Sequence, residues 1–229
     1  MCRGFTMEIL QAIKERHSVR QFKDLSIPTD IAQKLEALIK DANEKSGLNM
    51  QLICNDPDCF NTFLAHYGHF KNAVNYFALV GKKSLKNRDF LCGYYGQKLV
   101  LEAQMLGLNT CWVAGTYGKG KCKASLKADE KIVCVIAVGY GQSAGVAHKS
   151  KAVEKLCDLT QENRPDWFAR GLEAALLAPT ALNQQKFFIS LEGEEAVIRS
   201  KGGPMTQIDL GIVTCNFELA SGHVCKRNN

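Results

Sequence analysis

Glu15-Arg16-His17-Ser18-Val19-Arg20-Gln21-Phe22 is the stretch around which the rest of the chain is organised. It follows an amphipathic segment, from Met7 to about Glu15, whose apolar residues have helical spacing. Arginine presents a rigid fork of donors that suits phosphate oxygens, and Ser18 and His17 add further donors. The stretch therefore predicts a binding site for a dianion. A solvated basic turn after a helix remains the alternative at this point.

The composition is that of an ordinary globular protein and excludes few classes. The chain has 229 residues, of which 46% are hydrophobic and 23% charged, with a formal charge of +6. Because long basic runs and interleaved aromatic residues are absent, we expect no nucleic-acid partner. No apolar run approaches the ~20 residues of a membrane helix, and the start of the chain lacks the apolar core of a signal peptide. We therefore expect no membrane association.

Ten cysteines are scattered along the chain without a C-x-x-C pair or the Cys/His spacing of a zinc site. Cys92 and Cys134 lie inside apolar stretches, where a free cysteine behaves as a small hydrophobe. This usage predicts reduced thiols in a cytoplasmic protein with no metal site.

Apolar periodicity and terminal residues predict alternating helices and strands. Helices are expected at 7–15, from Pro28 to Ser46, at 87–107, at 165–178 and at 206–220. Strands are expected at 48–53, 76–80, 109–113, 132–138 and 187–191. The run 132–138 is continuously apolar, which is typical of a strand covered on both faces. We expect residues 222–229, which are polar and basic, to be loose.

A weak internal echo links the two parts of the chain. Leu35-Glu36-Ala37 precedes Asn49-x-Gln51 and an apolar strand, and Leu172-Glu173-Ala174 precedes Asn183-x-Gln185 and an apolar strand. A duplicated half folded into one pseudo-symmetric domain would explain the pattern. Chance similarity between two amphipathic helices explains it equally well.

Four motifs resemble those of FMN-dependent nitroreductases. They are Arg16-His17-Ser18-Val19-Arg20-x-Phe22, the segment from Ala103 to Gly115 (A-Q-M-L-G-L-N-T-C-W-V-A-G), Val138-Gly139-Tyr140-Gly141 with the basic loop 148–151, and Ala178-Pro179-Thr180-Ala181-Leu182-Asn183-Gln184-Gln185. The resemblance covers roughly residues 7–220. It implies an α+β, nitroreductase-like fold with a mixed central sheet flanked by helices.

The order of these motifs departs from the common family pattern. In the common form, the loop resembling 178–185 comes soon after the R-H-S-x-R segment, and the enzymes are homodimers with FMN at the interface. This chain resembles the branch with a duplicated, pseudo-dimeric monomer. The resemblance thus implies a monomer with one FMN, an extension at 1–6, and a domain at 7–221 made of half-repeats at about 7–160 and 161–221.

The resemblance also implies which residues hold the cofactor. The phosphate would be bound by Arg16, Ser18 and His17 from one side and by Lys149 and Lys151 from the other. Arg20 would reach the ribityl chain or the O2/N1 edge of the ring. The ring would be lined by Val113, Ala114, Gly115, Pro179, Thr180, Ala181 and Asn183. For Asn183 the alternative is a turn residue, and for the two lysines it is a solvated loop.

The implied activity is reduction of nitroaromatics, quinones or similar small acceptors by NAD(P)H, in a ping-pong reaction through flavin N5. Such chemistry needs no dedicated acid or base, so no catalytic side chain is expected. Two alternatives stay open: a flavin-binding or redox-sensing protein without catalytic turnover, and a degenerate relative that binds nothing.

Overall fold

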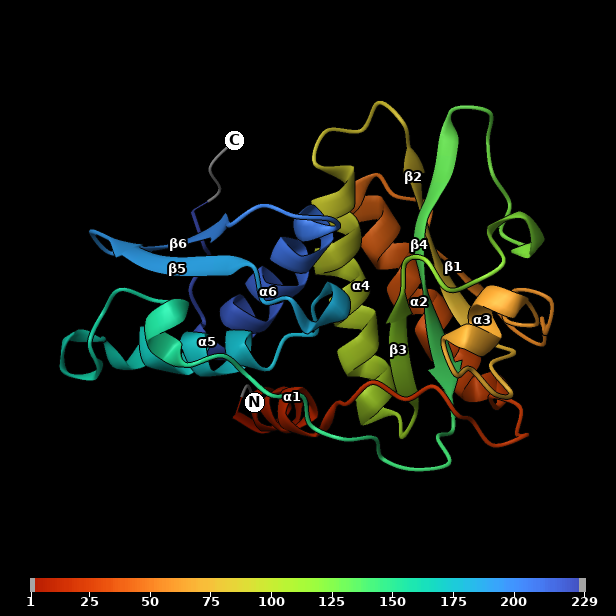
Figure 1. The fold of residues 1–229 in the computed structure, drawn as a ribbon, viewed down its shortest axis with the longest axis horizontal. Coiled ribbons are helices and arrows are strands. Elements are labelled where there is room, and N and C mark those ends of the chain that lie inside the picture. The colour runs from red at the N-terminus through yellow and green to blue at the C-terminus, as the bar shows by residue number, and fades with distance from the viewer. Residues whose placement is uncertain (1–2, 227–229) are drawn as a thin grey trace.

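The computed structural model describes residues 3–226 and consists of helices and antiparallel strands (Figure 1). In chain order the elements are α1 (Arg3–Glu15), α2 (Thr29–Ser46), β1 (Gln51–Ile53), α3 (Phe63–Tyr67), β2 (Tyr76–Lys82), α4 (Arg88–Met105), β3 (Asn109–Val113), β4 (Glu130–Gly139), α5 (Asp166–Leu176), β5 (Phe187–Glu192), β6 (Glu195–Ser200) and α6 (Thr206–Ser221).

The main sheet has the order β1-β2-β4-β3, and both of its faces are covered. Side chains alternate along β2. Phe77 and Leu79 belong to the core shared with α2 and α4, whereas Tyr76, Ala78 and Val80 face the segment that contains α3. Strand β4 is likewise buried on both sides, as its apolar run predicts.

Helices α4 and α6 cross at two glycines, and this crossing joins the sheet to the rest of the molecule. A Cβ at Gly93 would lie 2.1 Å from the Ile208 carbonyl oxygen, and a Cβ at Gly211 would lie 2.1 Å from the Phe90 carbonyl oxygen. Each glycine thus faces the carbonyl three residues before the other glycine. The local symmetry agrees with an internal duplication, which stays a prediction.

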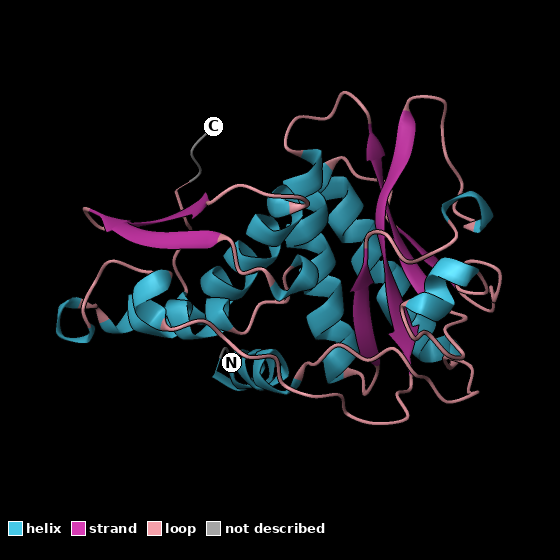
Figure 2. Cartoon of the chain, in the orientation of Figure 1, coloured by secondary structure: helices cyan, strands magenta, loops and turns pink. Residues whose placement is uncertain are grey.

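Helices separate the main sheet at one end of the molecule from the β5–β6 hairpin at the other (Figure 2). Helices α5 and α6 pack together there through Phe168, Phe217 and Gly171. A Cβ at Gly171 would lie 2.7 Å from the Phe217 ring, so glycine permits this close packing.

The α+β class is confirmed, with two refinements. The ladders of the main sheet are antiparallel, and within residues 3–226 parallel pairing is limited to isolated bridges such as Ser18 with Thr110. Helix α3 and strand β6 were not predicted, because the first is a short exposed turn and the second a short partly exposed strand.

The two chain ends correct the predicted boundaries. Helix α1 begins at Arg3, so residues 3–6 continue the helix rather than forming a separate extension; residues 1–2 lie outside the described part. The prediction of a loose end is wrong for 222–226. Cys225 is buried, its N–H donates to Glu218, and the Lys226 N–H donates to the Ala196 carbonyl of β6. Residues 227–229 lie outside the described part. Between residues 3 and 226, no helix is long and apolar enough to cross a membrane.

Candidate functional site

The structure has a cavity of about 780 Å³, and this volume falls in the usual range of cofactor sites. Its walls come from segments far apart in the sequence. They are residues 16–20, the end of β3 with the following loop (111–116), the loop residues 145, 146 and 148, the loop 179–183, and the start of α6 with the residues before it (204–212).

The first wall is an extended segment held by β3. Ser18 forms a parallel bridge with Thr110, and the Val19 N–H donates to the Thr110 carbonyl (3.0 Å). Val19 and Phe22 are buried in the core on the other side of the segment. The segment therefore presents Arg16, Ser18 and Arg20 to the cavity.

Arg16 is the most unusual side chain of the site, because it is a buried cation to which the described residues offer no partner. Its residue is 4% exposed, and within the part of the chain that the structure describes its Nε has no hydrogen-bond acceptor. Burial lowers the pKa of Arg16 to about 10, and the neighbouring Cys111 opposes this shift. An unpaired buried charge is costly, which indicates that Arg16 is complementary to an anionic ligand.

The second wall is the loop 179–185, whose backbone is strained. Leu182, Asn183 and Gln185 have φ values of 52°, 51° and 45°, in the left-handed region that non-glycine residues rarely adopt. The buried Asp209 of α6 holds this loop: it accepts from the Ala181 N–H (2.9 Å) and from Gln184 Nε2 (2.7 Å). Burial raises the pKa of Asp209, and these two hydrogen bonds partly offset the rise.

The basic loop after β4 contributes a histidine rather than lysines. His148 lies in the cavity wall and bonds the Leu176 carbonyl through Nε2 (3.0 Å). Lys151 Nζ instead donates to the carbonyls of Gln184 (2.6 Å) and Gln185 (3.2 Å), and the Lys149 carbonyl accepts from Gln185. Neither lysine lines the cavity, so the predicted approach of both lysines to one anion is not seen. Instead, Lys151 Nζ and the Lys149 carbonyl form hydrogen bonds with the loop 183–185.

A series of hydrogen bonds through buried side-chain amides holds Trp112 in the cavity wall. Trp112, which lines the cavity, donates from its indole N–H to Gln97 (3.3 Å), and Gln97 donates to Asn216 (2.9 Å). Asn216 in turn donates to the Ala174 carbonyl (3.0 Å). These hydrogen bonds connect Trp112 to α4, α5 and α6.

The rim of the cavity is apolar and exposed. Leu182 is 96% exposed, Val146 86% and Tyr67 76%, although all three line the opening. Apolar side chains around a mouth favour flat apolar ligands.

The structure brings together most of the predicted site residues. Eleven of them line this one cavity: Arg16, His17, Ser18, Arg20, Val113, Ala114, Gly115, Pro179, Thr180, Ala181 and Asn183. The sequence analysis missed Asp209, His148 and the apolar rim. His148 belongs to a motif already recognised, but nothing in the sequence distinguishes Asp209 from a solvated acid in the first turn of a helix.

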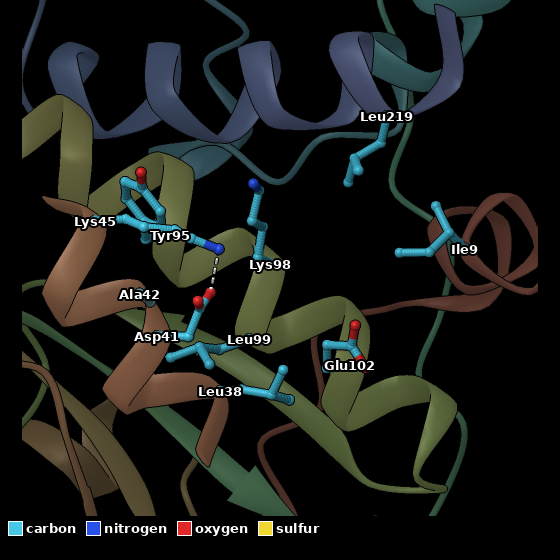
Figure 3. Close-up of a pocket in the computed structure, with 10 residues that line it drawn as sticks. All are labelled: Ile9, Leu38, Asp41, Ala42, Lys45, Tyr95, Lys98, Leu99, Glu102 and Leu219. Carbon is cyan, nitrogen blue, oxygen red and sulfur yellow. Dashed lines mark hydrogen bonds and ion pairs between the residues drawn. The ribbon is translucent and has the colours of Figure 1, made fainter. Parts of the chain in front are cut away.

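A second cavity of about 200 Å³ lies between α1, α2, α4 and α6 (Figure 3). It contains none of the predicted site residues, and its Asp41–Lys45 ion pair (2.7 Å) is exposed. It is therefore the weaker candidate.

Comparison with protein families now identifies the chain. Residues 8–221 match the family model described as "Putative TM nitroreductase". The chain belongs to this nitroreductase family. The matched range includes every residue that lines the larger cavity.

Solved structures share the fold. A Thermotoga maritima protein described as a "putative nitroreductase" has a TM-score of 0.67 and 24% identity, covering 93% of this chain and 82% of that one. A nitroreductase-like protein from Streptococcus mutans has a TM-score of 0.56 and 14% identity, covering 69% of this chain and all of that one (100%). A Desulfovibrio desulfuricans protein of similar description, solved in complex with FMN, has a TM-score of 0.52 and 23% identity, covering 69% and 98%. Among curated proteins, none matches the chain in sequence.

Proposed function

We propose that this nitroreductase-family protein is an FMN-dependent NAD(P)H oxidoreductase that reduces nitroaromatics, quinones or similar small acceptors. The observation that carries the proposal is the buried Arg16 in the wall of a cofactor-sized cavity, whose Nε has no hydrogen-bond partner among residues 3–226. Membership of the family and the FMN complex of the Desulfovibrio protein support it.

The donor set of the first wall fits the phosphate of FMN. A guanidinium can bond two phosphate oxygens at once, and the adjacent Ser18 hydroxyl supplies a further donor. His17 lies beside them at the cavity wall. A dianion bound here would neutralise the charge of Arg16, whose burial the described part of the chain leaves uncompensated.

The rest of the cavity fits a flat ring. Loop 179–183 and the backbone at 113–115 form two of its walls, and a Cβ at Gly115 would meet no atom within 4 Å. The backbone there can therefore be approached closely by a ligand. Asp209 and Gln184 hold the second wall in place, and the exposed rim admits an apolar acceptor.

When bound, FMN would supply the two-electron chemistry, and the protein would supply position and charge. Arg16 and Arg20 place positive charge at the cavity, which favours anionic ligands and developing negative charge there. No side chain needs to act as an acid or base in this account. Cytoplasmic location, a monomeric state and the two half-repeats remain predictions attached to the proposal.

The test is anaerobic reduction of the FMN-loaded protein by NADH and by NADPH, followed by addition of a quinone. Bleaching of the yellow absorption by either donor, with recovery on adding quinone, would support the proposal. A protein that binds FMN but is not reduced would favour the flavin-binding, non-catalytic alternative. A protein that binds no FMN would overturn both.

A further inference from the structure

The segments around the larger cavity carry most of the exposed apolar side chains. Five of these segments contribute lining residues, and we call them the mouth segments: 61–71, 114–121, 142–151, 178–186 and 201–205. Nine large apolar side chains are exposed in the described part of the chain, and six of them belong to the mouth segments: Phe63, Leu64, Tyr67, Val146, Leu182 and Met205. Such a concentration around one opening indicates a contact surface, whereas single scattered residues would not.

Helix α3 is held so that two of these side chains remain outside the core. Ala65 is fully buried, and the rings of Phe60 and Phe70, which flank the helix, pack with centroids 4.9 Å apart. Phe63 is 84% exposed, and it shares one helix face with Tyr67, four residues later. Because Tyr67 lines the cavity, this apolar face continues the cavity mouth outward.

The segment 178–186 exposes an apolar side chain at a strained position. Leu182 has a φ of 52° and is 96% exposed, so it combines backbone strain with an absence of burial. The Asp209 carboxylate fixes the preceding residue through the Ala181 N–H (2.9 Å). The fold therefore holds Leu182 out in solvent, and packing within the chain does not explain this position.

The mouth segments also carry the positive charge of the protein. They contain no Asp or Glu and seven lysines, all exposed: Lys71, Lys119, Lys121, Lys149, Lys151, Lys186 and Lys201. Without these seven, the chain would have 22 Lys and Arg against 23 Asp and Glu. The formal charge of +6 thus arises from the surface that also exposes the apolar side chains, which complements an anionic surface.

Two of the lysines lie directly beside α3. The Gly118 N–H donates to the Cys59 carbonyl (2.7 Å), and a Cβ at Gly118 would lie 2.8 Å from Thr62, the residue that caps α3. Lys119 and Lys121 follow Gly118 in the chain, and both are exposed. Ammonium groups are therefore placed next to the start of the exposed apolar helix.

We propose that the mouth segments dock on the surface of a bilayer that contains anionic lipids. The apolar side chains would enter the boundary between headgroups and acyl chains, and the lysines would contact lipid phosphates. The cavity would then open onto the bilayer and take apolar quinones dissolved in it as electron acceptors. This last step rests on the proposed function, whereas the docking itself does not.

The charge and the arrangement of the surface favour a bilayer over other occupants. A second copy of the chain would bring lysines against lysines, and like charges across an interface repel. An acidic protein would satisfy the lysines, but a protein interface needs a fitted apolar core. Here the apolar side chains project singly from separate segments, and lipids can rearrange around each of them.

This proposal revises the expectation, drawn from the sequence, of no membrane association. That expectation was based on the absence of an apolar run, which concerns membrane-spanning helices. Docking on a bilayer surface needs only side chains gathered from several segments, and the fold brings these together at one cavity.

The first experiment measures sedimentation of the full-length protein, as purified, with lipid vesicles. The vesicles consist of phosphatidylcholine alone or with ~30% phosphatidylglycerol, in ~0.1 M or ~1 M NaCl. We expect binding to the anionic vesicles at low salt, and binding at least about tenfold weaker to pure phosphatidylcholine. High salt should weaken binding to the anionic vesicles because it screens the lysines.

Apolar variants test whether side chains enter the bilayer. F63S and V146S should each weaken binding to the anionic vesicles by about fivefold or more. V224S is the matched control for V146S, because Val224 is 78% exposed and lies outside the mouth segments, so its binding should be unchanged. All three side chains are exposed, and circular dichroism checks that each variant is folded.

Charge variants test the contact with lipid phosphates. The double variant K119Q/K121Q should weaken binding by about 20-fold, at roughly fivefold for each lysine near an anionic surface. K34Q/K40Q makes the same change of charge at two exposed lysines of α2, outside the mouth segments, and should weaken binding by less than about threefold.

A comparison of two quinones tests the consequence for activity. F63S should reduce a long-chain quinone held in anionic vesicles about fivefold more slowly than the natural protein does. It should reduce a water-soluble quinone at the natural rate, because Phe63 does not line the cavity. If the natural protein reduced neither quinone, the proposed function would fail, while sedimentation would still decide the docking.

Three results would overturn the docking proposal. The first is no binding to anionic vesicles at low salt. The second is binding that K119Q/K121Q abolishes but that F63S and V146S leave unchanged, which would show attraction of charge without entry into the bilayer. The third is a dimer in solution that V146S dissociates and V224S does not, which would assign the surface to contact between two copies.

Discussion

Replacement of Arg16 by methionine should weaken FMN binding and, at the same time, stabilise the ligand-free protein. The two effects have one cause. Arg16 is a buried cation without a partner in the described residues, so it costs free energy until an anion arrives. A residue needed only for packing would show neither the gain in stability nor the specific loss of binding.

The magnitude of the first effect follows from the pKa. Burial lowers the pKa of Arg16 from 12.5 to about 10, which corresponds to ~3 kcal/mol at about 1.4 kcal/mol per pKa unit. Because the folded-state pKa of this cation is lowered, the cost is fully present below about pH 10 and disappears only above the unfolded value. At pH 7, we therefore expect R16M to raise the free energy of unfolding of the FMN-free protein by ~1–3 kcal/mol.

The second effect is set by charge-assisted hydrogen bonds to phosphate. Loss of a bidentate guanidinium contact should cost ~2–4 kcal/mol, which is about 30-fold to about 700-fold in Kd. R16K keeps the charge but not the fork, so its affinity should lie between the two. R170M is the matched control, because Arg170 is exposed on α5 and lines neither cavity.

The assays are FMN titration by flavin fluorescence and urea unfolding of the FMN-free protein at pH 7. R170M should behave as the natural protein in both. The reasoning would be refuted if R16M lost stability while its FMN affinity stayed within threefold of the natural value.

Three further changes test other parts of the structure. G93A places a Cβ 2.1 Å from the Ile208 carbonyl oxygen, so its free energy of unfolding in urea should fall by at least ~3 kcal/mol. G120A is the control: its Cβ meets nothing within 4 Å, so its free energy of unfolding should change by less than ~1 kcal/mol. Equal stabilities of the two variants would contradict the close crossing of α4 and α6. Burial raises the pKa of the Asp56 carboxyl, but hydrogen bonds from Tyr76 and Lys123 lower it by more, so the net pKa is below its ordinary value. The carboxylate therefore adds stability above ~pH 4, and this stability is lost as the pH falls through the folded-state pKa. D56N should therefore cost ~1–3 kcal/mol at pH 7 and progressively less at pH 3, and a cost independent of pH would argue against this role. D209A removes the acceptor of the Ala181 N–H and one of the two acceptors of Gln184 Nε2, which keeps the Pro204 carbonyl. Hydrogen exchange at residues 181–184 should therefore accelerate, and FMN should bind more weakly. Unchanged exchange would show that Asp209 does not hold the loop.

Local sequence patterns predicted most helices and strands, but they did not predict the contacts between segments far apart in the chain. Helix α2 ends at Ser46, and the apolar run at 132–138 is the doubly covered strand β4, both as predicted. The residues of the recognised motifs at 16–20, 113–115 and 179–183 meet at one cavity. Each of these features depends on the residue types within one short stretch of sequence, so the sequence alone suffices to predict it.

What could not be predicted depends on contacts between distant segments. Lys149 and Lys151 are basic residues in a recognised motif, yet the carbonyls of Gln184 and Gln185 draw Lys151 away from the cavity. Asp209 resembles any acid in a first helical turn until the fold brings the loop 181–184 to it.

The most direct test of the central claim is the number of FMN molecules bound per chain. The protein is stripped of any ligand, titrated with FMN in the fluorimeter, and separated from free FMN before the bound flavin is weighed. We expect one FMN per chain, a yellow absorption band, and much weaker FMN binding in R16M. A protein that stays colourless with excess FMN, or that binds FMN equally well without Arg16, would show that this cavity is not an FMN site built around Arg16.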